Sequence, residues 1–375
     1  LFVFIRDMFG NILHTFRRYD WLLTIVVFIL VSIGLAAIYS VDLSKGSSLI
    51  YFPKQLFALC LGSVILFTFG ALHKTRYESV ARFSYIVGLV LLVAVLFFGQ
   101  EIRGTTGWFR FGGFSFQPAE FAKLTLVLLL GWWISKQGRR FDTWEFVASS
   151  TIATGLYVGL IMLQPDLGSA SILLGIWFGL LLLTGIKKRY IFSFLLIGVC
   201  AAVFAWFFLL QGYQKERLAT FMDPQRDPLG SGYNVTQSII AIGSGGFFGR
   251  GLGFGSQSQL HFLPEAQTDF IIAVIGEELG FVGLSSVFVL YTILIWRLIH
   301  IASIVKDDFS SYTILGVALI FLIQVCINVG GATGLLPVTG VTLPFVSYGG
   351  SSLMMNFFLL SITISINASH KKIYQ

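Results

Sequence analysis

The sequence predicts an all-α integral membrane protein with about ten transmembrane helices. Of its 375 residues, 56% are hydrophobic and only 11% are charged, which excludes an ordinary soluble domain. A helix needs about 20 apolar residues to cross a hydrocarbon core about 30 Å thick. Ten continuous runs of this kind lie near residues 21–40, 55–71, 82–99, 119–135, 145–163, 168–185, 190–210, 270–297, 311–329 and 350–368. They do not alternate apolar and polar residues as β-barrel strands do, so helices are expected.

The distribution of positive charge predicts the orientation of these helices. With the N-terminus inside and the spans alternating, the inner segments carry about twice as many Lys and Arg residues as the outer ones. Both termini are therefore expected in the cytoplasm, and residues 1–375 are expected to form a single multi-pass membrane domain. Attraction of the inner clusters to anionic lipid headgroups accounts for the net charge of +7, so nucleic acid is not expected as a partner.

Irregular backbone is concentrated on the outer side. All eight prolines lie in or beside segments assigned to that side, and proline removes a backbone donor and interrupts helices. The three cysteines lie singly in apolar runs without CxxC spacing, so neither a disulfide framework nor a cysteine metal site is expected. A functional site is therefore predicted at the outer face.

The largest outer segment is a loop over residues 211–269, between the seventh and eighth predicted helices. A loop of this length is usually functional or disordered, and its many aromatic and aliphatic residues favour a structured, functional loop. Its glycines fit neither the G-x-G-x-x-G register nor the phosphate-loop register. They could still bring backbone amides close to a pyrophosphate. Basic residues are mixed with acidic ones along the loop. The basic residues are Lys215, Arg217, Arg226 and Arg250.

Charged residues near the membrane interior are candidates for function, because burying them is costly. Glu120 and Lys123 lie on one face at the start of the fourth predicted helix. They either neutralise each other inside the bundle, or Lys123 lines an outward-facing cavity and binds an anionic group while Glu120 orients it. Glu277 and Glu278 lie about two turns into the eighth helix. A structural role, such as capping a broken helix or pairing with a basic group, is favoured for both.

Asp269 closes the large loop at the predicted membrane surface. One interpretation is a helix N-cap, since an Asp before an apolar run is a typical start signal. The other is a general base at the boundary of water and membrane. Asp166, between the fifth and sixth helices, is expected in a turn. Trp108 and Arg110 precede the fourth helix, and a Trp in this place is typical of a membrane interface.

Five motifs in fixed order resemble those of the SEDS family (shape, elongation, division and sporulation), whose members include RodA, FtsW and SpoVE. The motifs are GWFRFGGFSFQPAEFAKL, QPDLGSA, DPLGSGYNVTQSIIAIGSGGFFGRGLG, LPEAQTDFIIAVIGEELGFVG and GLLPVTGVTLPFVSYGGSS. The resemblance implies a peptidoglycan glycosyltransferase that polymerises lipid II into glycan strands on the outer face of the bacterial cytoplasmic (inner) membrane. It also implies a partner, a single-span class B penicillin-binding protein that crosslinks the new strand.

The resemblance also implies roles for individual residues. The family's essential acid falls on Asp269, its QP-[SA]-E-x-x-K motif on Glu120 and Lys123, and the aromatic residue of the preceding loop on Trp108. Positive charge for the substrate is expected from Lys123 together with Arg110 and Arg217. QTDFII stands where many members read HTDFIF, so any role of that histidine is absent. The motifs mix features of RodA and FtsW, which leaves elongation, division and sporulation open.

The expected reaction is a glycosyl transfer. Asp269 takes the proton from the 4-hydroxyl of the acceptor GlcNAc as this oxygen attacks the anomeric carbon of the donor MurNAc. The pyrophosphate leaves, stabilised by positive charge or by a divalent cation, Mg or Mn, and no other cofactor is expected. The alternative function is a flippase or transporter for the same lipid, and a non-catalytic scaffold ranks below it. Spans with few ionisable residues disfavour a polar path through the bilayer.

Overall fold

The structure, a computed structural model, describes residues 19–44, 49–102, 104–111, 114–137, 143–208, 212–222 and 231–373. Helices dominate it, and each of the ten predicted apolar runs falls on a helix. The helices on these runs are α2 (Trp21–Leu43), α3 (Phe52–Gly70), α4 (Lys74–Phe98), α5 (Pro118–Lys136), α6 (Trp144–Met162), α7 (Leu167–Leu183), α8 (Lys188–Phe208), α12 (Ile271–Ile304), α13 (Asp308–Ala332) and α14 (Gly350–Ile373).

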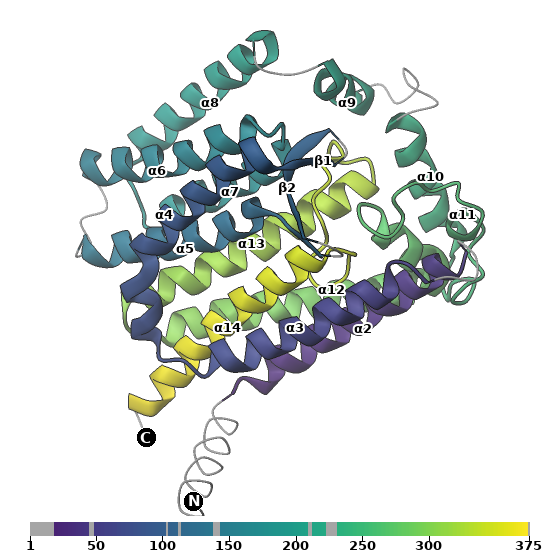
Figure 1. The fold of residues 1–375 in the computed structure, drawn as a ribbon, viewed down its shortest axis with the longest axis horizontal. Coiled ribbons are helices and arrows are strands. Elements are labelled where there is room, and N and C mark those ends of the chain that lie inside the picture. Colours follow the sequence, from purple (N-terminus) through teal and green to yellow (C-terminus); the bar gives the residue numbers. More distant parts are fainter. Residues whose placement is uncertain are drawn as a thin grey trace, which may run out of the picture.

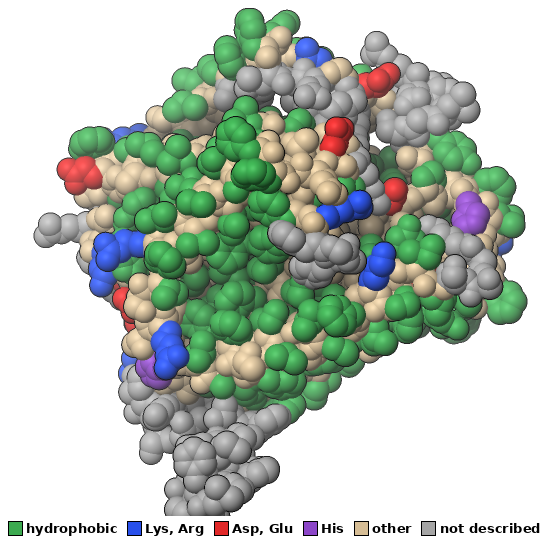
Figure 2. Space-filling model, in the orientation of Figure 1, with side chains coloured by type: hydrophobic (Ala, Val, Ile, Leu, Met, Phe, Trp, Pro, Cys, Tyr) green, Lys and Arg blue, Asp and Glu red, His purple; other side chains and the backbone are tan. Residues whose placement is uncertain are grey.

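Seven of the described helices are long and apolar enough to cross a membrane. They are α2, α3, α4, α6, α12, α13 and α14. Figure 2 shows hydrophobic side chains spread over the helices of one face of the molecule, where charged side chains are few. The prediction of a membrane protein built from helices is confirmed at this level.

The helices form a bundle in which α14 is the most buried of the seven spans. α14 runs along α3 and also contacts α4, α5 and α13, while α12 packs against α13 and α2 (Figure 1). The start of α2 and the end of α14 lie on the same side of the bundle (Figure 1). The core therefore brings N-terminal and C-terminal helices into contact.

Three helices begin with an aspartate that caps the first turn. The side chains of Asp20, Asp166 and Asp307 each accept a hydrogen bond from the amide three residues later, at 3.2, 2.9 and 3.0 Å. These residues precede α2, α7 and α13, and such caps satisfy amides that have no partner within the first helical turn. The turn position predicted for Asp166 is confirmed.

A small three-stranded sheet between α4 and α5 adds to the predicted helices. Its strands β1 (Gln100–Ile102), β2 (Thr105–Phe111) and β3 (Phe114–Phe116) pair antiparallel in the order β1-β2-β3. The sequence of β2, TTGWFRF, is rich in the β-branched and aromatic residues that favour strands. The sheet contacts α4 and α5 through β2, and α14 through β3.

The described part of the predicted loop over residues 211–269 (212–222 and 231–269) contains three helices, α9 (Gly212–Met222), α10 (Ser231–Ser244) and α11 (Ser256–Gln259). Its glycine-rich part fits a break in α12 at Gly280, where φ is 65° and ψ is −160°. Backbone hydrogen bonds join residues 246–251 to residues 277–282 across this break. Gly249 has a φ of 82°, and a Cβ there would overlap the carbonyl of Glu278. Close backbone packing therefore requires glycine at this position.

Candidate active site

Asp269 is the half-buried residue that ends the large loop just before α12. The amides of Thr268 and Asp269 both donate to the carbonyl of Glu265, which turns the chain into the helix. The N-cap position of α12 belongs to Phe270, so the N-cap interpretation of Asp269 is wrong. Asp269 lies one residue before this N-cap position.

Asp269 lines a small pocket between α13 and the irregular segment that follows it. The pocket is also lined by Asn328 of α13 and by Thr339, Gly340 and Val341. The other lining residues are uncharged, so Asp269 is the acidic residue of the pocket. This pocket is a place where a substrate hydroxyl could approach the carboxylate.

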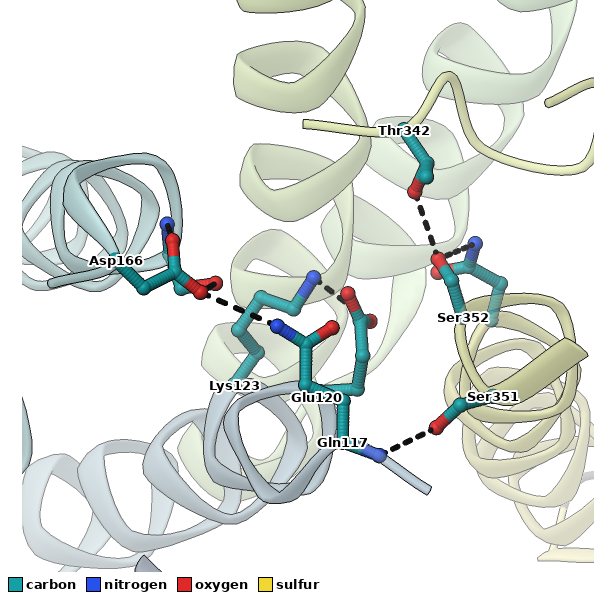
Figure 3. Close-up of polar contacts among 9 residues, drawn as sticks. Gln117, Glu120, Lys123, Asp166, Thr342, Ser351 and Ser352 are labelled. Carbon is teal, nitrogen blue, oxygen red and sulfur yellow. Dashed lines mark hydrogen bonds and ion pairs between the residues drawn. The ribbon is translucent and has the colours of Figure 1, made fainter. Parts of the chain in front are cut away.

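Glu120 and Lys123 form a buried ion pair at the start of α5. The Lys123 Nζ lies 2.8 Å from the Glu120 Oε2, and the two residues are 1% and 6% exposed. Figure 3 shows the two side chains turned toward each other. Mutual neutralisation, one of the two predicted interpretations, is confirmed. Binding of an anionic group by Lys123 stays a prediction.

Gln117 connects this ion pair to two neighbouring helices. Its side-chain amide donates to the Asp166 Oδ2 at 3.2 Å, and its backbone amide donates to the Ser351 Oγ at 3.2 Å (Figure 3). The starts of α5, α7 and α14 therefore meet around one residue, through its side chain and its backbone amide. The sequence did not predict Gln117 or Ser351 as site residues, although Gln117 lies in the QPAE part and Ser351 in the YGGSS part of the family motifs.

The irregular segment after α13 closes over these helix starts. Thr342 and Ser352 share a hydrogen bond of 3.0 Å, which ties the segment to α14 (Figure 3). A Cβ on Gly168, in the first turn of α7, would lie 2.8 Å from the Thr339 carbonyl oxygen, so α7 and the segment are in close contact. The Asp269 pocket and the Glu120–Lys123 pair thus border the same group of helix ends.

Trp108 and Arg110 lie on β2 of the small sheet. Trp108 is half-buried and opposite Gln100, whereas Arg110 is exposed and opposite Ser115. The sheet contacts α4 and α5 through β2, and a role of Trp108 or Arg110 in substrate binding stays a prediction. Arg217 lies on α9, and its side chain lies outside the described residues.

Glu277 and Glu278 hold the large loop against α12. Glu277 is fully buried and accepts from the amides of Gln257 and Ser258, at 2.7 and 3.0 Å, at the start of α11. Glu278 is 1% exposed and accepts from the Ser40 hydroxyl, which reaches in from α2. The structural role predicted for both is confirmed, although the helix that Glu277 caps is α11.

The described residues contain no group of three or more His, Cys, Asp or Glu side chains arranged to hold a metal ion. The chain's own residues therefore show no preformed cation cage in the ranges that the structure covers. A divalent cation that accompanies the pyrophosphate stays a prediction.

Comparison with known proteins identifies the class of protein that has this fold. A family model for FtsW, RodA and SpoVE, described as cell cycle protein, matches residues 20–372. Stage V sporulation protein E of Bacillus subtilis (strain 168) is 35% identical over 364 residues, covering 95% of this chain and 98% of the relative. Peptidoglycan glycosyltransferase MrdB of Escherichia coli (strain K12) is 37% identical over 342 residues, covering 88% of each.

Two solved structures share the fold over nearly the whole chain. The rod shape determining protein RodA of Thermus thermophilus matches with a TM-score of 0.71 and 31% identity, over 95% of this chain and 98% of RodA. A chain from a structure on the coordination of polymerization and crosslinking by a peptidoglycan synthase complex matches with a TM-score of 0.79 and 32% identity, over 95% and 99%.

The chain belongs to the FtsW/RodA/SpoVE family, as its motifs indicated. Membership, together with the apolar helices, makes it a multi-pass protein of the bacterial inner membrane.

Proposed function

We propose that this chain is a peptidoglycan glycosyltransferase that polymerises lipid II on the outer face of the cytoplasmic membrane. The observation that carries the proposal is the place of Asp269. Asp269 lines a pocket at the end of the bundle, next to the meeting point of the starts of α5, α7 and α14. A carboxylate at such a boundary can meet a sugar hydroxyl from water and a lipid-linked donor from the bilayer.

We place this end of the bundle outside and both termini in the cytoplasm, with ten helices crossing the membrane. Chain direction supports this arrangement, because the pocket lies where α5, α7, α12 and α14 begin. The opposite end holds two ion pairs. Asp20 before α2 pairs with Arg297 near the end of α12, and Lys74 at the start of α4 pairs with Asp307 before α13. Basic residues at that end agree with the positive-inside rule.

In the proposed reaction, Asp269 is the general base. Its carboxylate accepts the proton of the acceptor GlcNAc 4-hydroxyl while that oxygen forms a bond to the anomeric carbon of the donor MurNAc. The bond from this carbon to the lipid pyrophosphate breaks, and its electron pair leaves with the pyrophosphate. General-base assistance is typically worth about 10²–10⁴-fold in rate.

Lys123 is proposed to stabilise the pyrophosphate by exchanging partners. Glu120 neutralises Lys123 in the structure, so an incoming anion must displace that carboxylate or share the ammonium group with it. Trp108 and Arg110 on the sheet and Arg217 on α9 are proposed to contact the sugar and anionic parts of lipid II. Their places on separate elements suit a long substrate with chemically different parts.

The proposed partner is a class B penicillin-binding protein. This proposal is supported by the match to a chain of a peptidoglycan synthase complex in which polymerisation and crosslinking are coordinated. The partner would crosslink the strands that this chain polymerises.

The experiment is polymerisation of purified lipid II by the chain reconstituted with its class B partner, with moenomycin present to silence unrelated glycosyltransferases. Glycan strands are expected from the wild type and from Asp308→Asn, a control at the opposite end of the bundle, and none from Asp269→Asn. Full activity of Asp269→Asn would overturn its assignment as base. An intact complex without strands, combined with movement of labelled lipid II across vesicle membranes, would favour the flippase.

A further inference from the structure

Three successive backbone carbonyls, at and just before Asp269, are each held by a hydrogen bond from a distant part of the chain. The Gln267 carbonyl accepts from the Tyr348 amide at 2.8 Å. The Thr268 carbonyl accepts from the Ser347 hydroxyl at 2.6 Å, and the Asp269 carbonyl accepts from the Asn328 side-chain amide at 3.2 Å. With the amides of residues 268 and 269 bound to the Glu265 carbonyl, the backbone beside the proposed base is fixed on both sides.

The donors of these bonds are themselves fixed. Ser347 and Asn328 are each 4% exposed, and the Asn328 amide also donates to the Val341 carbonyl at 2.8 Å. Gln55 of α3 is 1% exposed and binds on both sides of Tyr348. It donates to the Ser347 carbonyl and accepts from the Gly349 amide, both at 3.1 Å.

Two further features set the place of Gln55 and Ser347. The fully buried Asp42 accepts from the amides of residues 50–52 at 3.0, 2.7 and 2.8 Å, which fixes the start of α3 and hence Gln55. Phe345, a buried residue with a φ of 67°, forms the turn that leads to Ser347. A bulky residue rarely adopts this conformation, and such strain persists where the surroundings over-determine it.

We infer that Gln55, Asn328 and Ser347 are positioning residues that aim the Asp269 carboxylate, and we call them the carbonyl clamp. The inference rests on the proposed role of Asp269 as the base. The clamp acts through the backbone, so its loss changes the direction of the carboxylate. Ser347 and Gln55 are not among the residues that line the Asp269 pocket, so their substitution tests this effect without altering the lining, whereas Asn328 also lines the pocket. A general base must lie within hydrogen-bond reach of its proton, and a misplacement of about 1 Å can cost about 10²-fold in rate.

The test measures kcat and KM for lipid II in the reconstituted complex, together with the thermal unfolding midpoint. The variants are Ser347→Ala, which removes a clamp donor, and Ser347→Thr, which keeps the hydroxyl. The matched control is Ser365→Ala. Ser365 lies on α14, and its hydroxyl also donates to a backbone carbonyl, that of Leu72, but at the opposite end of the bundle. Asn328→Ala and Gln55→Met test the clamp at its other members.

Ser347→Ala and Gln55→Met are each expected to lower kcat by tenfold or more with KM within twofold, while Ser347→Thr recovers most of the rate. Asn328→Ala is expected to lower kcat by a similar factor, and its KM can also change because Asn328 lines the pocket. Ser365→Ala is expected to lower the unfolding midpoint by a similar amount without this loss of kcat. If Ser347→Ala does not fold, Gln55→Met gives the same readout. Equal kcat in the clamp variants and in Ser365→Ala would overturn the clamp.

Asp269→Asn separates the two hypotheses. If it abolishes polymerisation while the clamp variants keep full kcat, the clamp is wrong and the proposed function stands. If Asp269→Asn keeps polymerising, the role of Asp269 as base is wrong, and the clamp then has no base to aim.

Discussion

Lys74 and Asp307 form an ion pair that joins the start of α4 to the start of α13. Burial alone would raise the pKa of Asp307, but hydrogen bonds from Lys74 and Ser310 and the charge of Lys74 outweigh burial and lower the pKa below its ordinary value of 3.8. A carboxyl whose pKa is lowered by folding stabilises the fold above its ordinary pKa. That stabilisation is lost as the pH falls through the lowered value.

This linkage predicts that the unfolding midpoints of the wild type and of Asp307→Asn differ by an amount that depends on pH. The wild type is expected to unfold at a higher temperature near neutral pH, and the difference is expected to shrink as the pH falls below 3.8. The measurement is the unfolding midpoint of the detergent-solubilised proteins by intrinsic fluorescence across this range. Other carboxyls titrate equally in both proteins, so a difference that does not change with pH would contradict the prediction.

A double-mutant cycle on the Glu120–Lys123 pair is expected to separate stability from activity: the double variant recovers stability but not activity. Lys123→Met alone leaves Glu120 buried without its partner and is expected to destabilise the fold by about 3–5 kcal/mol. The double variant Glu120→Gln, Lys123→Met removes both charges and is expected to recover most of this stability. If Lys123 also binds the pyrophosphate, lipid II polymerisation stays low in the double variant. Recovery of full activity there would show that the pair has only a structural role.

The end of the bundle opposite Asp269 holds a second buried ion pair whose loss is expected to destabilise the fold. Arg297 of α12 binds Asp20 at 2.8 Å, and the Asn367 side-chain amide donates to the same carboxylate at 2.9 Å. The Asp20 side chain is only 1% exposed, so Arg297→Ala is expected to cost about 3 kcal/mol through an uncompensated buried charge. Thermal unfolding checks this, with Asp20→Asn added to Arg297→Ala as the compensating change. Failure of the second substitution to restore any stability would indicate that packing of the arginine is the larger effect.

The packing of the loop against the break in α12 predicts opposite effects on stability for the same substitution at Gly249 and at Gly243. Gly249→Ala places a Cβ against the Glu278 carbonyl at a φ of 82°, so it is expected to destabilise the loop and lower activity. Gly243→Ala adds a methyl group in open space on α10, where alanine stabilises a helix by about 0.5–1 kcal/mol relative to glycine. Limited proteolysis of residues 245–260 and the unfolding midpoint measure both effects. Similar destabilisation by both substitutions would be the contrary result.

The sequence predicts local features of this fold well. Long apolar runs mark the helices, Asp166 in QPDLGSA marks the turn between two of them, and the i, i+3 spacing of Glu120 and Lys123 marks an ion pair. Each of these features is set by residues that lie close together in the sequence. The small sheet is not predictable from local sequence in this way, because its strands of three, seven and three residues are stabilised mainly by pairing with each other.

The surroundings of Asp269 are not predictable in the same way. Its backbone contacts come from Asn328 and Ser347, 59 and 79 residues along the chain from the carbonyls that they bind. These polar side chains lie in apolar or glycine-rich stretches, where they resemble ordinary core or turn residues. The N-cap interpretation of Asp269 is wrong because the turn at Glu265 moves the helix start to Phe270.

The carbonyl clamp holds main-chain atoms, and every residue type offers the same carbonyl. Position 267 is gripped through its carbonyl by the Tyr348 amide, while its own side chain contacts Glu265. A histidine at position 267, as in the HTDFIF form of the motif, would offer the Tyr348 amide the same carbonyl that glutamine offers here. The direction of the acid therefore depends on the residues that donate to these carbonyls, and the side chain at position 267 matters less to it.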